Sequence, residues 1–262
     1  MEMKLTGVPE TMLQTLYARA KESKSGRGYL KDPMAEKIVS CMDYDFKNAD
    51  RDRAMYTGVV ARTILLDRMT EVFLKNHPGT TVVNLACGLD TRCCRLKGSY
   101  KMWYNLDLPE TMAVRRQFLK ETGEIVQIAG SAMDPEWTKQ VTVTEGPVLV
   151  IMEGLTMYLN ESDVKKIFQI LDRKFASMVV FAEVMNPWAV DHIKEKSIEG
   201  SSARFSWGIS SGRQLQEMVP PFVSAEDHSL TEGMQVFLPV YKILGKIRFV
   251  RNISNKILVL KK

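Results

Sequence analysis

Residues 80–107 constrain the fold more than any other stretch of the chain. The stretch opens with an apolar run at 81–85 that is rich in β-branched residues, which is typical of a buried strand. Three small residues follow, the last of them Gly88, and a second apolar run at 102–106 leads into Asp107. In a βαβ unit, the 19 positions from Gly88 to Asp107 bring the glycine turn and the acidic strand tip to one edge of a sheet.

This turn and this acid together predict a nucleoside-binding edge. Glycine lets the backbone approach a ligand closely, and a carboxylate can accept hydrogen bonds from both vicinal hydroxyls of a ribose. A dinucleotide site uses three glycines, in the pattern G-x-G-x-x-G, to bring a helix N-terminus to a pyrophosphate. The turn here has one glycine, and the anionic Asp90 two residues later suits a cationic ligand end, such as the amino acid part of S-adenosylmethionine. The pattern alone leaves the nucleoside open.

The rest of the chain alternates strand and helix patterns, which predicts an α/β fold with a doubly wound sheet. Further strands are expected at 124–129, 147–152, 178–184, 222–230 and 257–260. The wholly apolar run at 147–152 suits the centre of a parallel sheet. Helices are expected at 9–24, from Pro33 onward, at 50–75, at 90–97, at 109–121, at 161–175 and at 214–218.

Three segments resemble the leucine carboxyl methyltransferase family, which includes bacterial O-methyltransferases of polyketide-type metabolism. They are NLACGLDTRCCRL at 84–96, WYNLDLPETMAVRRQFL at 103–119 and VLVIMEGLTMYLNESDVKKIF at 148–168. The resemblance covers residues 15–185, and three ordered motifs are more specific than any one of them. Ala86 departs from the pattern, because the family usually has a glycine at that position.

The resemblance implies a class I S-adenosylmethionine-dependent methyltransferase, with a Rossmann-like sheet of seven strands whose last strand is antiparallel. It further implies a helical cover over residues 1–75 and a core over 76–262, together forming a single domain. The segment 186–212 mixes aromatic residues with Gly and Ser, and we interpret it as an inserted lid that shapes the substrate site.

The resemblance also implies roles for individual residues. S-adenosylmethionine would be bound by Arg62, Ala86, Gly88, Asp90, Asp107, Leu108, Asp134 and Glu153. Glu153 and Tyr158 would lie at the reacting centre, and Arg19, Lys24 and Trp207 are the candidates for contacting the acceptor.

Several of these residues also have a simpler structural interpretation. Asp90 and Glu153 are suited to helix starts, and Asp134 to the N-cap of a short helix at 135–138. The basic candidates Arg19, Lys24 and Arg62 could lie on solvated helix faces. His192, a possible base, could equally be a solvent-facing helix residue.

Composition limits the partners. The net charge of +5 comes from interspersed acids and bases, so no nucleic-acid partner is expected. No apolar run is long enough for a membrane span and no secretory leader is seen, so no membrane partner and a cytoplasmic location are expected. The four cysteines form no CxxC pair and the three histidines are scattered, so no metal site is expected. With no secretory leader, the cysteines are expected to be free thiols. The oligomeric state is not indicated.

The predicted function is methyl transfer from S-adenosylmethionine to a carboxylate or hydroxyl of a small acceptor. A carboxylate acceptor needs no general base at neutral pH, and the sequence offers no compelling base. A narrower alternative is methylation of a protein C-terminal carboxylate. An NAD-dependent dehydrogenase and a nucleoside-binding module without catalysis are the alternatives from other classes.

Overall fold

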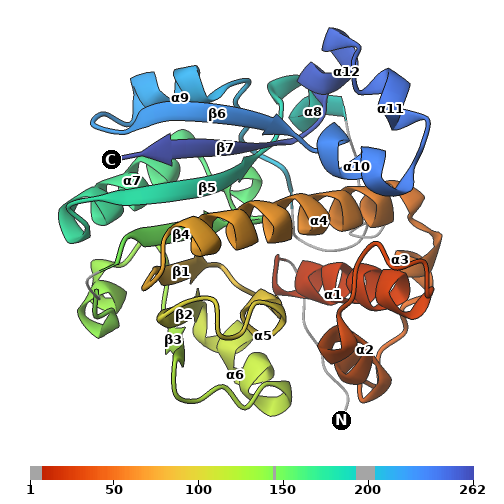
Figure 1. The fold of residues 1–262 in the computed structure, drawn as a ribbon, viewed down its shortest axis with the longest axis horizontal. Coiled ribbons are helices and arrows are strands. Elements are labelled where there is room, and N and C mark those ends of the chain that lie inside the picture. Colours follow the sequence, from red (N-terminus) through yellow and green to blue (C-terminus); the bar gives the residue numbers. More distant parts are fainter. Residues whose placement is uncertain (1–7, 144–145, 193–203) are drawn as a thin grey trace.

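The computed structural model describes residues 8–143, 146–192 and 204–262. Seven strands form one sheet in the order β3-β2-β1-β4-β5-β7-β6 (Figure 1). The strands are β1 (Thr81–Leu85), β2 (Met102–Asp107), β3 (Ile125–Ala129), β4 (Val148–Met152), β5 (Met178–Val184), β6 (Val223–Ser229) and β7 (Lys256–Lys261). β7 runs antiparallel between β5 and β6, whereas the pairs from β3 to β5 are parallel. The predicted seven-stranded sheet with an antiparallel last strand is confirmed.

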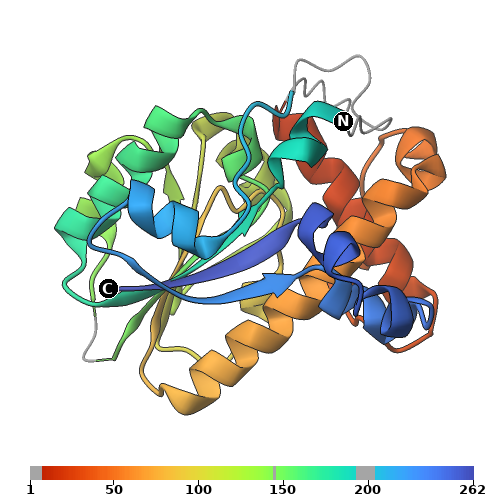
Figure 2. The ribbon, with the colours of Figure 1, turned by 90° about the horizontal axis from the view of Figure 1, so that it is seen from above.

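Helices cover both faces of this sheet, and Figure 2 shows α4 on one side with α7 and α9 on the other. The helices before β4 are α1 (Val8–Lys24), α2 (Pro33–Ser40), α3 (Lys47–Arg51), α4 (Arg53–Asn76), α5 (Arg92–Arg95), α6 (Pro109–Phe118) and the 3-10 helix η1 (Pro135–Gln140). Those after it are η2 (Thr156–Tyr158), α7 (Glu161–Lys174), α8 (Pro187–His192), α9 (Gly212–Met218), α10 (Thr231–Phe237), α11 (Tyr241–Leu244) and α12 (Arg248–Ile253).

The core has two layers because alternate strand residues point to opposite faces of the sheet. On one face, Val83 and Leu85 of β1 pack in a cluster with Phe168 of α7. On the other face, Val82 packs in a cluster with Leu66 of α4. Every residue of β1 and of β4 is buried, as the apolar central run predicts.

The helices differ from the predicted ones at Asp52 and between β6 and β7. The helix expected over 50–75 is divided at Asp52, which ends α3 and caps α4 by accepting a hydrogen bond from the backbone N–H of Met55 over 2.9 Å. The segment between β6 and β7, where no helix was expected, contains α10, α11 and α12. Part of the predicted lid, residues 193–203, lies outside the described residues, and its described beginning forms α8.

The division into a cover and a core stays a prediction. Within the expected cover, α1 packs against α2 and α4, while α4 itself also packs on the sheet. Among the described residues, no helix combines the length and the apolar content needed to cross a membrane.

Candidate active site

The turn after β1 has a left-handed backbone. The φ angles of Ala86 and Gly88 are 53° and 48°, a region that residues with a Cβ rarely adopt. A Cβ on Gly88 would also lie 3.1 Å from the Cβ of Met12 on α1. Glycine at this position therefore lets the turn pass close beneath the first helix.

Asp107 is held at the end of β2 by the same turn. Its Oδ2 accepts a hydrogen bond from the backbone N–H of Gly88 over 2.7 Å, and its Oδ1 accepts one from Leu108 over 2.7 Å. Burial raises the pKa of Asp107 above its ordinary value, although these two backbone donors act in the opposite direction. The predicted meeting of the glycine turn and the acidic strand tip is confirmed.

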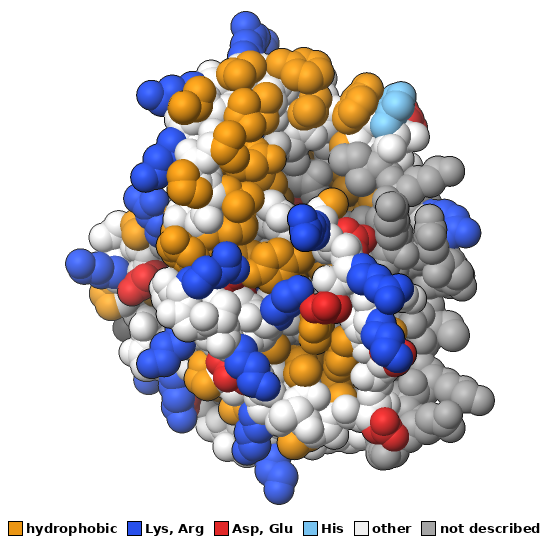
Figure 3. Space-filling view, turned by 90° about the vertical axis from the view of Figure 1, so that its right-hand side faces the viewer, with side chains coloured by type: hydrophobic (Ala, Val, Ile, Leu, Met, Phe, Trp, Pro, Cys, Tyr) orange, Lys and Arg blue, Asp and Glu red, His pale blue; other side chains and the backbone are white. Residues whose placement is uncertain are grey.

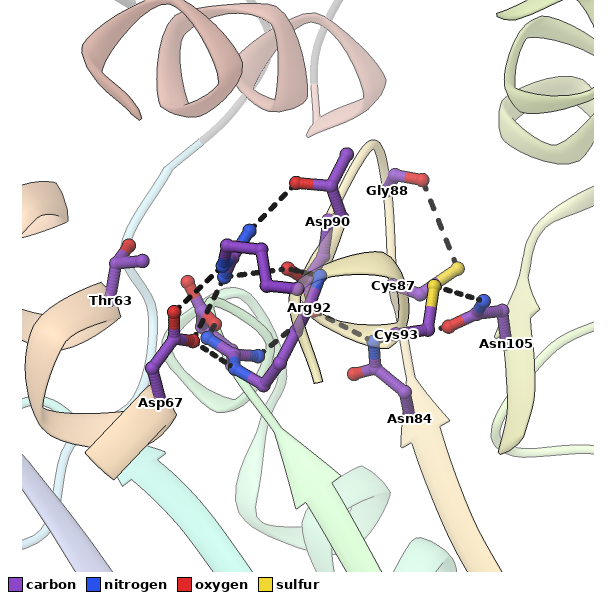
Figure 4. A network of polar contacts seen from close by, with 12 residues as sticks. Thr63, Asp67, Asn84, Cys87, Gly88, Asp90, Arg92, Cys93 and Asn105 are labelled. Carbon is purple, nitrogen blue, oxygen red and sulfur yellow. Dashed lines mark hydrogen bonds and ion pairs between the residues drawn. The ribbon is translucent and has the colours of Figure 1, made fainter. Parts of the chain in front are cut away.

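Beside the turn lies a buried guanidinium that binds three carboxylates (Figure 4). Arg92, the first residue of α5, is fully buried. Its nitrogens bind Asp67 Oδ1 at 2.6 Å, Asp90 Oδ2 at 2.9 Å and Glu153 Oε2 at 2.8 Å. Arg92 thus joins helix α4, the turn after β1 and the end of β4. Asp90 also accepts a hydrogen bond from the backbone N–H of Arg92 at the start of α5, although the N-cap residue of that helix is Thr91.

These ion pairs fix the charge state of the acids. Burial alone would raise the pKa of Asp90, but Arg92 and Arg95 outweigh it and hold that pKa below its ordinary value. The pKa of Glu153 is likewise lowered, because Arg92 and Arg62 outweigh the effect of burial. Both side chains are therefore anionic at neutral pH.

Arg62 of α4 reaches across to the ends of β4 and β5. Its Nε donates to Glu153 Oε1 over 2.8 Å, and its Nη1 donates to Glu183 Oε2 over 3.2 Å. Glu183 also accepts the backbone N–H of Gly154 over 2.7 Å. Sequence reasoning missed Glu183, and the signal that could have identified it is one acid inside the otherwise apolar β5.

Arg19 is not a solvated side chain. It is buried on α1, where its Nε donates to Asp32 Oδ2 over 3.1 Å and its Nη2 donates to the carbonyl oxygen of Leu89 over 2.7 Å. It therefore ties the first two helices to the turn after β1. Lys24, the last residue of α1, is exposed and solvated, as the simpler interpretation expects.

A cleft of about 710 Å³, open mouth included, runs along this edge of the sheet. It is lined by Thr11, Met12, Thr15, Arg19, Arg62, Asn84, Ala86, Cys87, Gly88, Leu89, Asp90, Asp107, Leu108, Thr111, Glu153, Gly154 and Leu155. The structure thus brings together seven of the eight predicted cofactor-binding residues. The eighth, Asp134, is exposed and does not line the cleft; it accepts the backbone N–H of Glu136 over 3.1 Å at the start of η1.

A second pocket of about 470 Å³, open mouth included, adjoins the cleft. The two share Thr11, Thr15, Arg62 and Gly154. The second pocket is further lined by Gln14, Met55, Val59, Met157, Tyr158, Met185, Phe205 and Asn255. Half of its lining residues are thioether, aliphatic or aromatic, and its charged group is the guanidinium of Arg62 at the junction.

The other predicted substrate-site residues take different positions. Tyr158 lines the second pocket, and its ring centroid lies 5.5 Å from that of Phe205. Trp207 is half-buried and packs against the core, and it lines neither of the two cavities. His192 is exposed, stacks on Trp188 and lies outside both cavities. The roles assigned to Tyr158 and Trp207 stay predictions.

All four cysteines are free thiols, as predicted. Among the described residues, one group of metal-ligand type occurs: Cys93, Cys94 and Glu121, whose ligand atoms lie within 4.8 Å of one another. Arg115 already binds Glu121 Oε1 at 2.5 Å, so a cation there would compete with a buried guanidinium. The absence of a metal site stays a prediction.

The chain is similar to known proteins in both sequence and structure. The model of the leucine carboxyl methyltransferase family matches residues 12–172. The tetracenomycin polyketide synthesis O-methyltransferase TcmP of Streptomyces glaucescens is 32% identical over 236 residues, which cover 88% of this chain and 86% of that protein. The S-adenosyl-L-methionine-dependent methyltransferase dpfgK of Gibberella zeae is 32% identical over 238 residues, covering 82% and 80%.

Two solved structures share the fold at low sequence identity. Magnesium protoporphyrin IX methyltransferase from Synechocystis PCC 6803, with bound S-adenosylhomocysteine, has a TM-score of 0.53 at 10% identity and covers 88% of this chain and 93% of that one. The plantazolicin methyltransferase BamL has a TM-score of 0.52 at 10% identity and covers 97% and 98%. At this identity the likeness shows the fold alone.

Proposed function

The chain belongs to the leucine carboxyl methyltransferase family and is an S-adenosylmethionine-dependent methyltransferase, and we propose that it methylates an oxygen of a small, largely apolar acceptor. The observation that carries this proposal is the second pocket, which has a largely apolar part formed by Met55, Val59, Met157, Tyr158, Met185 and Phe205 and which meets the cofactor cleft at Arg62 and Gly154. The curated relatives are named as methyltransferases, which sets the dehydrogenase alternative aside.

The residues of the cleft fit S-adenosylmethionine. Asp107 is positioned to accept hydrogen bonds from the ribose hydroxyls, and the Gly88 turn that holds it lines the same cleft. The anionic Asp90 and Glu153 suit the ammonium and sulfonium charges, and Arg62 suits the carboxylate of the amino acid part. When bound, the cofactor supplies an electrophilic methyl group on its sulfonium sulfur.

The protein's own contribution is to position and desolvate the acceptor. Among the described residues that line the second pocket, none is Asp, Glu, His or Lys, so no ordinary general base faces the acceptor. An acceptor oxygen that is already ionised needs no base. We therefore propose an apolar carboxylic acid, or an acidic phenol, as the acceptor class. The methyl transfer is then catalysed chiefly by proximity and orientation.

Product analysis with a panel of apolar carboxylic acids, phenols and aliphatic alcohols tests the acceptor class. We expect methyl esters or methyl ethers from the acids and acidic phenols, and little turnover of alcohols. Met185→Trp should fill the second pocket and abolish turnover while leaving the affinity for S-adenosylhomocysteine unchanged. Val72→Trp, at a position of α4 that is 53% exposed, is the matched control. Turnover restricted to peptides with a free C-terminal carboxylate would instead support the protein-modifying alternative.

A further inference from the structure

The C-terminal stretch differs in charge from the rest of the chain. Residues 233–262 contain seven Lys and Arg and no Asp or Glu, whereas the remaining 232 residues hold 29 basic and 31 acidic side chains. The net charge of the protein is thus concentrated in its last 30 residues. The stretch includes most of α10 and all of α11 and α12, which the predicted function does not use.

The same three helices expose large apolar side chains. We call this the α10–α12 surface: Val236, Val240, Ile243, Ile247 and Phe249, which are 45%, 55%, 73%, 46% and 67% exposed. Figure 3 shows hydrophobic side chains gathered at the top of this face, with Lys and Arg along their edge. Single exposed apolar residues are ordinary, but a contiguous group with a charged rim marks an interaction site.

The basic rim is made by side chains of the same segment. Lys242, Lys246, Arg248 and Arg251 are all exposed and alternate along the chain with the apolar residues. A face that presents Phe, Ile and Val together with Lys and Arg is typical of a segment that lies in a membrane interface. Anionic lipid headgroups attract such bases, while the apolar side chains enter the boundary of the acyl chains.

The surface is fixed to the body of the enzyme. A Cβ on Gly233 would lie 2.0 Å from the carbonyl oxygen of Ala61, so α10 contacts the backbone of α4 directly. Phe237 packs against Val60 and Ala61, one residue before Arg62. Two residues after α12 ends, Asn255 lines the second pocket. A ligand of this surface would therefore be held next to the acceptor pocket.

We propose that the α10–α12 surface docks on an anionic membrane, with the protein lying on the bilayer rather than crossing it. A second copy of the chain is a poorer occupant, because a two-fold interface through this surface would place its bases against their own copies. The proposal does not depend on the chemistry of the acceptor.

Sedimentation of the full chain with unilamellar vesicles tests the proposal. We expect binding to vesicles of phosphatidylcholine with 30% phosphatidylglycerol, weak binding to pure phosphatidylcholine, and release as the salt concentration rises. The double variant Lys242→Gln and Lys246→Gln should have a vesicle partition coefficient about 25-fold lower, because each basic charge removed lowers it about fivefold. Lys75→Gln with Lys120→Gln, exposed lysines of other segments, removes the same charge and should leave binding unchanged.

Ile243→Ser with Phe249→Ser tests the apolar part, and both side chains are exposed enough that the fold should persist, which the melting temperature verifies. Loss of vesicle binding in this variant supports the proposal. Equal binding to both vesicle types, or binding that neither pair of surface substitutions changes, would overturn it. A concentration-dependent dimer that this variant abolishes would assign the surface to a second copy and would also overturn it.

Discussion

The backbone N–H of Gly88 donates to Oδ2 of Asp107 over 2.7 Å, so the turn after β1 and the tip of β2 form one unit. Two residues that are 19 positions apart in the sequence are thus joined by one hydrogen bond. The carboxylate is therefore oriented before any ligand arrives, and its position depends on the turn that lines the cleft with it.

The first prediction concerns Asp107. Asp107→Asn should weaken the binding of S-adenosylhomocysteine by about 10- to 100-fold, because a hydrogen bond to a charged group contributes about 1.5–3 kcal/mol. An amide also cannot accept from both Gly88 and Leu108, since one of its two ends is a donor. Calorimetric titration measures the affinity. Glu71→Gln, on an exposed position of α4, should bind as the wild type does.

The pH dependence of this binding gives a second observable for the same variant. Because burial raises the pKa of Asp107, the wild type should lose affinity during acidification at a higher pH than an ordinary aspartate would. Asp107→Asn should lack this decrease. An unchanged affinity in the variant at neutral pH would show that the ribose is not bound here.

The second prediction concerns Ala86, whose φ angle of 53° is unfavourable for a residue with a Cβ. Ala86→Gly should relieve about 1–2 kcal/mol of backbone strain, offset by about 0.4–1 kcal/mol of extra unfolded-state entropy. We expect urea unfolding to show equal or slightly higher stability. Ala113→Gly, on the exposed face of α6, should instead lose about 1 kcal/mol. A similar decrease in the free energy of unfolding in both variants would contradict the left-handed backbone at Ala86.

The third prediction concerns thiol reactivity. Cys41 is exposed, whereas burial raises the pKa of the Cys87 thiol and so suppresses its reactive thiolate. The pKa of Cys93 is also raised, first by its interaction with Cys94 and then by burial. With a thiol-specific chromogenic reagent at neutral pH, Cys41 should react rapidly and the partly buried Cys94 more slowly. Cys87 and Cys93 should react only in denaturant, and Cys41→Ser should remove the rapid phase.

The strands could be predicted from sequence because they are short apolar runs bounded by turn residues. The expected and observed limits agree at 81–85 and 178–184 and differ by one or two residues elsewhere. The short helices α11 and α12 were missed for a physical reason. They have four and six residues and follow Pro239 and Gly245, so neither is long enough to show a helical period.

The site was harder to predict than the fold. Motifs identified Asp90 and Glu153, since both follow strands at the sheet edge. They did not identify Arg92 as the link between them and Asp67, because the three acids lie at distant chain positions and meet only after folding. Sequence spacing locates strand ends, whereas the pairing of buried charges depends on the packing of α4 and α5.

The last prediction concerns that link. Arg92→Met should destabilise the protein by about 3–5 kcal/mol, because removal of one partner of a buried ion pair leaves uncompensated charges. Arg92→Lys should restore little, since a single ammonium cannot reproduce the planar fork that binds three carboxylates. Arg116→Met, exposed on α6, should change the free energy of unfolding by less than about 0.5 kcal/mol.

The pH dependence of this loss distinguishes lost charge pairing from lost packing. In the wild type, the pKa values of Asp90 and Glu153 are lowered, so their ionised forms stabilise the fold at any pH above the ordinary carboxyl pKa. This stabilisation is lost only as pH falls through the lowered pKa values. Without Arg92, burial and mutual repulsion should raise the pKa values of Asp90 and Glu153. Protonation of these carboxylates near pH 5 to 4, a range around the ordinary carboxyl pKa, should then remove the repulsion and restore part of the variant's stability. The stability gap between variant and wild type should therefore narrow from pH 7 to pH 4. A gap that stays constant over this range would indicate that Arg92 acts through packing alone.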